Sequence, residues 1–383
     1  MTERATAITP SVLTWARERS GLSVPEVAES MGKSVEVVEA WEAGEAWPTY
    51  NQLEALAERL YHRPVALFFL PEPPLEPETQ QEFRTLPDFD IRRLKADTRY
   101  IVRVALSLQD SLRELTGGVN QASRLLLREV QEVRDEDIAS FAVWLREFLG
   151  VPLSRQTGWR YSEDAMSAWR GAVERAGVFV FKRPFRQREV SGFCLTDDEF
   201  PIIMVNNSTP HTRQIFTLFH ELAHLVYGVS SITTTDGSFV TRMSGPSQAL
   251  EVRCNRLAAE FLVPSDAFPW DRLDSAHLEQ SVSEIASLFN VSREVILRRV
   301  LDAGRIDAAA YQELAALWAQ DAGREGEGGN YYYNQATYLG DSFLRLAFSR
   351  YRAGLISAPE LAEHLGIKAK NLGRFEEKVG GRL

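Results

Sequence analysis

Apolar residues recur with a helical period along most of the chain and follow a strand pattern in one segment. Apolar residues three and four positions apart predict helices in the N-terminal stretches 10–70 and 91–149. Runs rich in β-branched and aromatic residues, each bounded by turn residues, predict three strands at 177–185, 191–197 and 200–207. Further helices are predicted after these strands, at 208–228, 249–264 and 282–304. The pattern predicts a mainly α protein with a small β-sheet, in the α+β class.

Some of these helices begin at recognisable capping residues. Ser23, followed by Glu26 three residues later, has the spacing of a capping box. Ser34 is expected to cap the next helix along the chain. Thr209 is expected to cap the helix of 208–228, with Pro210 in its first turn.

Shifts in composition divide the chain into segments. A proline-rich acidic stretch at 70–78 is the clearest boundary, and a glycine-rich stretch at 323–329 looks like a connector. Short helices separated by glycine turns before the first boundary suit a helix-turn-helix bundle. The predicted segments are this bundle, a helical linker region, a mixed α/β segment and a helical C-terminal region, at 1–71, 72–150, 151–310 and 311–383. No long repeat is evident.

The composition is that of an ordinary globular protein. The 383 residues are 44% hydrophobic and 25% charged, and no apolar run approaches the ~20 residues that a membrane span needs. The N-terminus has no signal-peptide pattern, and Cys194 and Cys254 do not make a disulfide framework. We therefore expect a cytoplasmic protein without membrane contact. The net charge of −10 argues against broad nonspecific nucleic-acid binding.

The apolar stretch FTLFHELAHLVYG, residues 216–228, carries three polar side chains, His220, Glu221 and His224. On a helix, His220 and His224 share one face, and both imidazoles can reach one metal at about 2.0–2.1 Å. Glu221 lies about 100° further round, beside a metal-bound water, as in the H-E-x-x-H motif of zinc peptidases. Zinc acidifies such a water and the carboxylate accepts its proton. The alternative is a core helix with hydrogen-bonded histidines, but three buried polar groups together favour a shared metal.

Glu251 and Glu260, in the helix of 249–264, are the candidates for a third ligand. Nine residues separate them, which is a rotation of about 180°, so both cannot face the site. Glu260 shares its side with Arg253 and Arg256, which predicts a solvated, ion-paired face. Glu251 shares its side with the core residues Cys254, Ala258, Phe261 and Leu262. Because a carboxylate on a core face needs a cation, we expect Glu251 to be the ligand.

Other polar residues near this stretch have weaker claims. Asn255, one turn after Glu251, could support a ligand, contact substrate or form an ordinary core hydrogen bond. His211 lies about opposite His220 on the helix, and Asp236 is the fallback ligand. The other histidines are expected to be structural or surface groups; they are His62, His277 and His364.

The two motifs, HELAH and ExxCNRLAAEFLVP, resemble those of the ImmA/IrrE family of zinc metallopeptidases, over roughly residues 155–300. Cys254 stands where that family usually has alanine. The resemblance implies a gluzincin-like fold, with zinc held by His220, His224 and Glu251 and with Glu221 as general base. It also implies cleavage of a partner helix-turn-helix repressor that controls stress-response or mobile-element genes.

Residues 10–70 resemble a helix-turn-helix domain of the XRE class, because WEAG at 41–44 is followed by Pro48 and Thr49. The charged residues of the expected recognition helix are all acidic, whereas DNA contacts need basic or amide side chains. Residues 1–70 as a whole contain six Lys and Arg against ten Asp and Glu, so little charge is available to neutralise phosphates. The plausible phosphate contacts are Arg17, Arg19 and Lys33. DNA binding is thus weakly supported, and a module kept for protein contact or dimerisation is an equal alternative.

The favoured interpretation is a regulatory zinc-dependent endopeptidase that cleaves a specific partner, in a stress-response, prophage or defence setting. The helical segments around the catalytic segment suit selective docking better than general digestion. The alternative is a non-proteolytic XRE-family regulator or antitoxin-like protein that binds DNA or a toxin partner, whose basic surface its acidic surface would mask. An oligomer is possible in either case.

Overall fold

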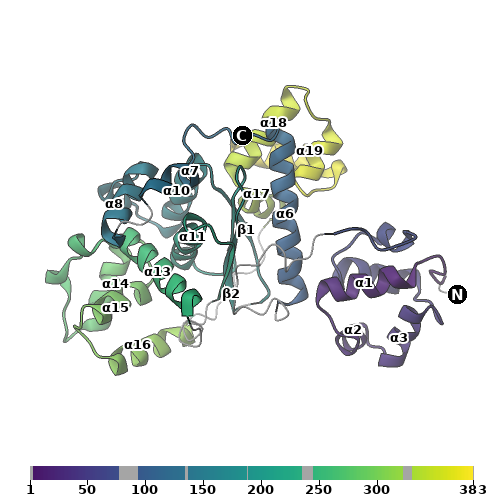
Figure 1. Ribbon diagram of the computed structural model, residues 1–383, viewed down its shortest axis with the longest axis horizontal. Helices are drawn as coiled ribbons and strands as arrows, with labels where there is room; N and C mark the ends of the chain where they lie inside the picture. Colours follow the sequence, from purple (N-terminus) through teal and green to yellow (C-terminus); the bar gives the residue numbers. More distant parts are fainter. Residues whose placement is uncertain are drawn as a thin grey trace. The chain divides into compact units, whose positions relative to one another are not determined.

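The computed structural model describes residues 3–76, 94–133, 137–187, 189–234, 245–321 and 330–382 (Figure 1). The chain divides into two compact units, Met1–Ser107 with Phe185–Arg188, and Leu108–Pro184 with Glu189–Leu383. The four-segment division expected from composition stays a prediction, and its connector at 323–329 lies outside the described residues.

The first unit begins with a bundle of short helices. They are α1 (Pro10–Ser20), α2 (Val24–Met31), α3 (Val35–Ala43), α4 (Tyr50–Glu54), a π-helical turn (Ala55–Leu60) and a 3₁₀ turn (Val65–Phe69). Ser23 and Glu26 form the expected capping box at the start of α2. Ser34 is the N-cap of α3 but its side chain makes no capping hydrogen bond, so that part of the prediction is wrong. Buried apolar side chains on α1, α2 and α3, with Trp41 among them, form the core of this bundle.

The next helices are α6 (Ala96–Thr116), α7 (Leu126–Glu129), α8 (Ile138–Leu149), α9 (Leu153–Gln156) and α10 (Ser162–Arg175). The helices expected within 91–149 are therefore confirmed. The boundary between the two units falls inside α6. Asp137 caps α8 by accepting hydrogen bonds from the backbone N–H groups of Ala139 and Ser140.

A small mixed sheet lies at the centre of the second unit (Figure 1). Its strands are β1 (Phe179–Arg183), β2 (Val190–Leu195), β3 (Ile202–Asn206) and β4 (Ser231–Thr234), in the order β1-β3-β2-β4. β1 runs parallel to β3, whereas β2 is antiparallel to both β3 and β4. The three expected strands are confirmed, and β4 is a fourth strand of the sheet. The mainly α, α+β class is also confirmed.

Two helices, α11 (His211–Val226) and α13 (Gly245–Leu262), connect the sheet to the helical layer. α11 packs against β2 and β3, and α13 packs against α11 and α8. The aromatic rings of Trp169, Phe219 and Phe261 meet where α10, α11 and α13 converge. The capping prediction for α11 is wrong: Pro210 is the N-cap itself, and the Thr209 hydroxyl instead donates to the carbonyl of Asn206. Pro210 lacks an N–H and has a fixed φ, which suits a helix start.

The remaining helices are α14 (Leu278–Phe289), α15 (Arg293–Asp302), α16 (Ala308–Asp321), α17 (Tyr331–Leu339), α18 (Asp341–Arg352), α19 (Ala358–His364) and α20 (Leu372–Val379). α17 packs on β1, and buried Arg170 of α10 donates to the carbonyls of Thr337 and Leu339 at the end of α17. This guanidinium therefore ties α17 to α10. No described helix combines the length and the hydropathy needed to cross a bilayer.

Candidate metal centre

His220 and His224 lie one turn apart on α11 and are both almost fully buried. Their Nε2 atoms approach each other to 3.1 Å. The Nδ1 atom of each ring is buried and has no hydrogen-bond partner among the described residues. Two adjacent imidazole nitrogens aimed at one point in a dry interior are typical of a metal site.

Glu251, on α13, brings a carboxylate to the same point. Its Oε2 is 3.4 Å from Nε2 of His220, and its Oε1 is 3.2 Å from Nε2 of His224. Within the described part of the chain, this is the one group of at least three His, Cys, Asp or Glu side chains close enough to share a metal. α13 begins after the undescribed segment 235–244, yet its packing on α11 is enough to bring the three side chains together.

The separations between these donor atoms fit a tetrahedral zinc ion. Ligand bonds of about 2.0–2.1 Å at tetrahedral angles place neighbouring donor atoms about 3.3–3.4 Å apart. The three measured separations are 3.1, 3.2 and 3.4 Å. Two imidazoles and a carboxylate with no thiolate are also a donor set suited to zinc or a similar divalent ion. His220, His224 and Glu251 therefore fit the zinc ion that the sequence predicts.

The charge of Glu251 and the two imidazoles stabilise one another. Burial raises the pKa of Glu251, but hydrogen bonds and charge from His220 and His224 outweigh burial and hold its pKa far below the usual range. Burial lowers the pKa of His220, but the Glu251 carboxylate outweighs it and the net pKa is raised. The carboxylate of Glu251 is therefore ionised, and its negative charge favours a cation between the three side chains.

Glu221 lies beside this cluster and is completely buried. Its Oε2 accepts a hydrogen bond from Oγ of Ser231, on β4, at 2.5 Å. Its Oε1 is buried and has no partner among the described residues. One carboxylate oxygen is therefore held in place while the other remains available, as a general base requires. The sequence gives no signal for Ser231, because its contact with Glu221 depends on how β4 pairs with β2.

Gly192 of β2 leaves the room that this carboxylate occupies. A Cβ at Gly192 would come within 2.6 Å of Cγ2 of Thr217 and 2.8 Å of the carbonyl oxygen of Met204. It would also lie 3.7 Å from Oε1 of Glu221. Glycine is therefore needed for α11 to approach the sheet this closely.

Two family models match parts of the chain. Residues 173–301 match a peptidase family model, the IrrE N-terminal-like domain. This segment is therefore similar to the IrrE N-terminal-like peptidase domain. Residues 13–60 match a helix-turn-helix model, so both predicted resemblances are confirmed. No curated protein matches the chain. The IrrE-like match supports an enzyme of the metallopeptidase type, and the His220, His224 and Glu251 cluster is compatible with its metal.

Glu260, the other candidate glutamate of α13, has a different environment from the one that the sequence predicts. Glu260 is buried, not solvated, and it does not pair with Arg253 or Arg256. Its carboxylate instead forms an ion pair with Arg299 at 2.8 Å and accepts hydrogen bonds from the backbone N–H and hydroxyl of Ser265. Glu260 thus ties the end of α13 to α15 and lies outside the metal cluster.

Asn255 lies next to the cluster, where its side-chain oxygen, as an acceptor, contributes to the raised pKa of His220. His211 begins α11 and is not part of the cluster. Asp236 lies outside the described residues. Each of the remaining histidines lies near a carboxylate: His62 near Asp97, His277 near Asp274 and His364 near Glu114.

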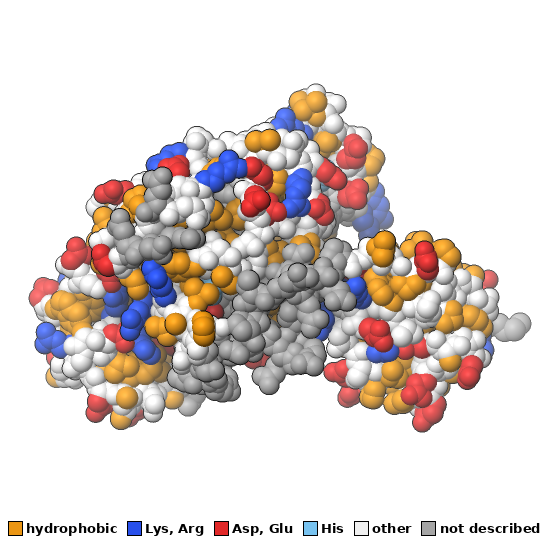
Figure 2. Space-filling model, viewed as in Figure 1, with side chains coloured by type: hydrophobic (Ala, Val, Ile, Leu, Met, Phe, Trp, Pro, Cys, Tyr) orange, Lys and Arg blue, Asp and Glu red, His pale blue; other side chains and the backbone are white. Residues whose placement is uncertain are grey.

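The predicted phosphate contacts of the N-terminal bundle are mostly occupied. Arg17 makes a two-bond ion pair with Glu42, at 2.7 and 3.0 Å, and also donates to the carbonyl of Leu22. Arg19 donates to the carbonyl of Glu76, whereas Lys33 is exposed. Figure 2 shows acidic side chains gathered over α2 and α3 on the face in view.

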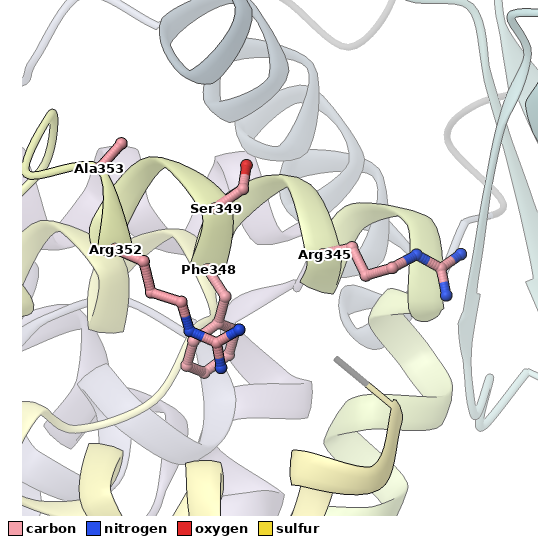
Figure 3. Close-up of a pocket in the computed structure, with 5 residues that line it drawn as sticks. All are labelled: Arg345, Phe348, Ser349, Arg352 and Ala353. Carbon is pink, nitrogen blue, oxygen red and sulfur yellow. The ribbon is translucent and has the colours of Figure 1, made fainter.

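A hollow of about 540 Å³ lies away from the cluster residues, along α18 (Figure 3). It is lined by Arg345, Phe348, Ser349, Arg352 and Ala353. Phe348 and Arg352 lie close together, and the Arg352 guanidinium covers the Phe348 ring at 5.6 Å. None of these residues belongs to the candidate metal centre.

Proposed function

We propose that the chain is a regulatory zinc-dependent endopeptidase that cleaves a specific partner protein. The observation that carries the proposal is that a cluster of three metal-donor side chains lies beside a buried carboxylate with only one hydrogen-bonded oxygen. The donors are His220, His224 and Glu251, and the carboxylate is Glu221, whose Oε1 has no described partner. The match to the IrrE-like peptidase family supports the same reading.

The chain's own residues have separate roles in the proposed reaction. His220, His224 and Glu251 would hold a zinc ion, which when bound would polarise the peptide carbonyl as a Lewis acid and acidify water. Glu221 accepts the proton of the attacking water at Oε1 and delivers it to the amide nitrogen as the peptide bond breaks. Ser231 holds the other oxygen of Glu221 so that Oε1 keeps its direction. Burial excludes bulk water from this carboxylate.

The proposed substrate is a helix-turn-helix repressor in a stress-response, prophage or defence setting. The resemblance to the ImmA/IrrE family supports this substrate class. The helix-turn-helix match at residues 13–60 supports a regulatory role, because a protease for general digestion does not need such a module.

A non-proteolytic regulator, or an antitoxin-like protein that binds a partner toxin, is the second candidate. The observation that favours it is the acidic exposed side of α3, where Glu36 and Glu39 are exposed and Arg17 is held by Glu42. Such a surface suits a basic partner protein. Under this reading, the metal cluster stabilises the fold without cutting a peptide bond.

The Glu221→Gln variant separates the two candidates. The substrate probe is the repressor encoded next to this protein's gene, incubated with the zinc-loaded chain with and without chelator. We expect cleavage by the wild-type chain, loss of cleavage with chelator, and loss of cleavage by Glu221→Gln with its zinc content unchanged. Cleavage that survives Glu221→Gln contradicts the mechanism. A bound partner that stays intact with wild type at every zinc level supports the second candidate.

A further inference from the structure

The C-terminal region repeats the helix-turn-helix sequence of the N-terminal bundle. SVPEVAESMG, at 23–32, recurs as SAPELAEHLG at 357–366. The Ser, Pro, Glu, Ala, Glu and Gly positions are identical, and three of the other four positions are apolar in both copies. The same offset continues into the next helix, where it pairs Val38 with Leu372 and Trp41 with Phe375. The recurrence is short, about twenty residues, and is not a long repeat.

The two copies have the same local structure. Ser23 with Glu26 and Ser357 with Glu360 form capping boxes at the starts of α2 and α19. The glycine that follows is left-handed in both, with φ of 60° at Gly32 and 62° at Gly366. The next backbone N–H donates to the alanine carbonyl five residues earlier, at 2.8 Å in the first copy and 2.9 Å in the second. Each copy therefore has a helix, the same tight turn and a second helix.

The second helix of each copy is anchored in the same way. Trp41 of α3 and Phe375 of α20 are both buried at equivalent positions. Glu42 pairs with Arg17 of α1, and its equivalent, Glu376, pairs with Arg352 of α18 at 3.2 Å. α1 and α18 each precede their copy along the chain. The buried aromatic residue is thus shared, and each glutamate pairs with an arginine of a preceding helix, although the second ion pair is more exposed.

The exposed sides of these second helices differ in charge. Residues 34–44 contain three acidic and no basic residues, whereas the equivalent 368–378 contain four basic and two acidic residues. Lys370, Arg374 and Lys378 are exposed: Lys370 lies in the 3₁₀ turn Ala369–Asn371, and Arg374 and Lys378 lie on α20 (Leu372–Val379), which begins directly after that turn. Lys370 replaces the equivalent acidic residue of α3, Glu36. Among the described residues, no carboxylate is within ion-pair range of Lys370 or Arg374.

We propose that residues 341–380 form a second helix-turn-helix module, and that its α20 face, which includes the 3₁₀ turn Ala369–Asn371 before the helix, binds duplex DNA. In helix-turn-helix proteins, the second helix enters the major groove and the helix before it lies near the backbone. Lys370, Arg374 and Lys378 supply charge for phosphates and guanine edges, and Asn371 supplies an amide suited to adenine. Arg345 and Arg352 of α18 add two more basic side chains to the module, both lining the hollow in Figure 3. Residues 341–383 carry eight basic against five acidic residues, in a chain of net charge −10.

The test compares two double charge reversals in the full chain. Lys370→Glu/Arg374→Glu reverses the α20 face, and the first substitution reproduces the residue of the N-terminal copy. Arg155→Glu/Arg175→Glu changes the net charge equally at two other exposed positions. The probe is a fluorescent mixed-sequence duplex of about 30 base pairs, roughly three helical turns, followed by anisotropy. Because phosphate contacts depend on salt, titrations begin at about 50 mM and continue upward.

We expect the wild-type chain and the Arg155/Arg175 variant to bind the duplex alike. The Lys370/Arg374 variant should bind at least about tenfold more weakly, and its plot of log affinity against log salt should be less steep by about 1.8. Circular dichroism reports whether each variant is folded, and Lys370→Ala/Arg374→Ala provides a milder change with the same predicted direction. Three results overturn the proposal: no wild-type binding at low salt, an equal loss in the Arg155/Arg175 variant, or a loss confined to Lys33→Glu, which would assign binding to the N-terminal bundle.

Discussion

The hydroxyl of Ser231 donates to Oε2 of Glu221 at 2.5 Å. The bond joins an edge strand of the sheet to the helix that carries both histidines. Buried Cys194 lies on the other side of this hydroxyl, with Sγ 3.3 Å from Oγ of Ser231. Burial and the negative charge of Glu221 raise the pKa of the Cys194 thiol well above its usual range, so it stays protonated. The candidate base is thus positioned by neutral neighbours.

Replacing Ser231 with alanine should slow cleavage of the proposed substrate between about 10- and 100-fold. The substitution leaves Oε2 of Glu221 buried without a partner and allows the carboxylate to turn. We expect kcat to fall more than KM changes, with zinc content unaffected. Ser287→Ala, on the exposed side of α14, is the matched control and should leave kcat unchanged. Equal activity of the Ser231→Ala and wild-type chains would remove the positioning role.

Glu251 and Glu260 can be distinguished by one matched pair of substitutions on α13. Glu251→Gln should lower zinc affinity by at least about tenfold, because it removes the charged donor of the cluster. Glu260→Gln should leave zinc binding intact and reduce the free energy of unfolding by about 1–3 kcal/mol, because it breaks a partly buried ion pair with Arg299. Metal analysis and chemical denaturation measure the two effects. Zinc loss in the Glu260 variant, with retention in the Glu251 variant, would reverse the assignment.

Acid should weaken the contribution of Glu260 in a defined pH window. Burial raises its pKa, but bonds from Ser265 and the charge of Arg299 outweigh burial, so its folded pKa is lower than the unfolded value of 4.5. Because the folded pKa is the lower one, the stabilisation is fully present above about pH 4.5 and is lost as pH falls through the folded pKa. The stability difference between wild type and Glu260→Gln should therefore be constant near neutral pH and shrink below about pH 4.5. A constant difference down to pH 3 contradicts the assigned cause.

Much of the cluster of His220, His224 and Glu251 could be predicted because its information is local. His220 and His224 are a helical turn apart, so their common face follows from the period of the helix. The choice of Glu251 followed from its place on the apolar side of α13. Both inferences concern the side of one helix on which a residue lies, and the spacing of a few neighbouring residues is enough to predict that side.

The features that could not be predicted depend on contacts between distant parts of the chain. Glu260 has the local pattern of a solvated residue, but its partner, Arg299, lies on another helix. Ser231 reaches Glu221 only because β4 adds to the edge of β2. The Thr209 prediction failed because its hydroxyl bonds to Asn206 in the turn and not to the helix. These outcomes were decided by tertiary contacts that no local pattern encodes.

The approach of α11 to β2 should fail when a single methyl group is added at Gly192. Its Cβ would lie 2.8 Å from the backbone carbonyl oxygen of Met204, which cannot rotate away as a flexible side chain can. We expect Gly192→Ala to reduce the free energy of unfolding by about 1–3 kcal/mol and to impair cleavage, because Glu221 lies against the same spot. Gly373→Ala is the control, since a Cβ on this part of α20 meets no atom within 4 Å and alanine favours a helix. Calorimetry measures the melting temperatures of both variants. Equal melting temperatures would mean that the sheet shifts to admit the methyl group at Gly192. The close fit between β2 and α11 would then not be what holds Glu221 in position.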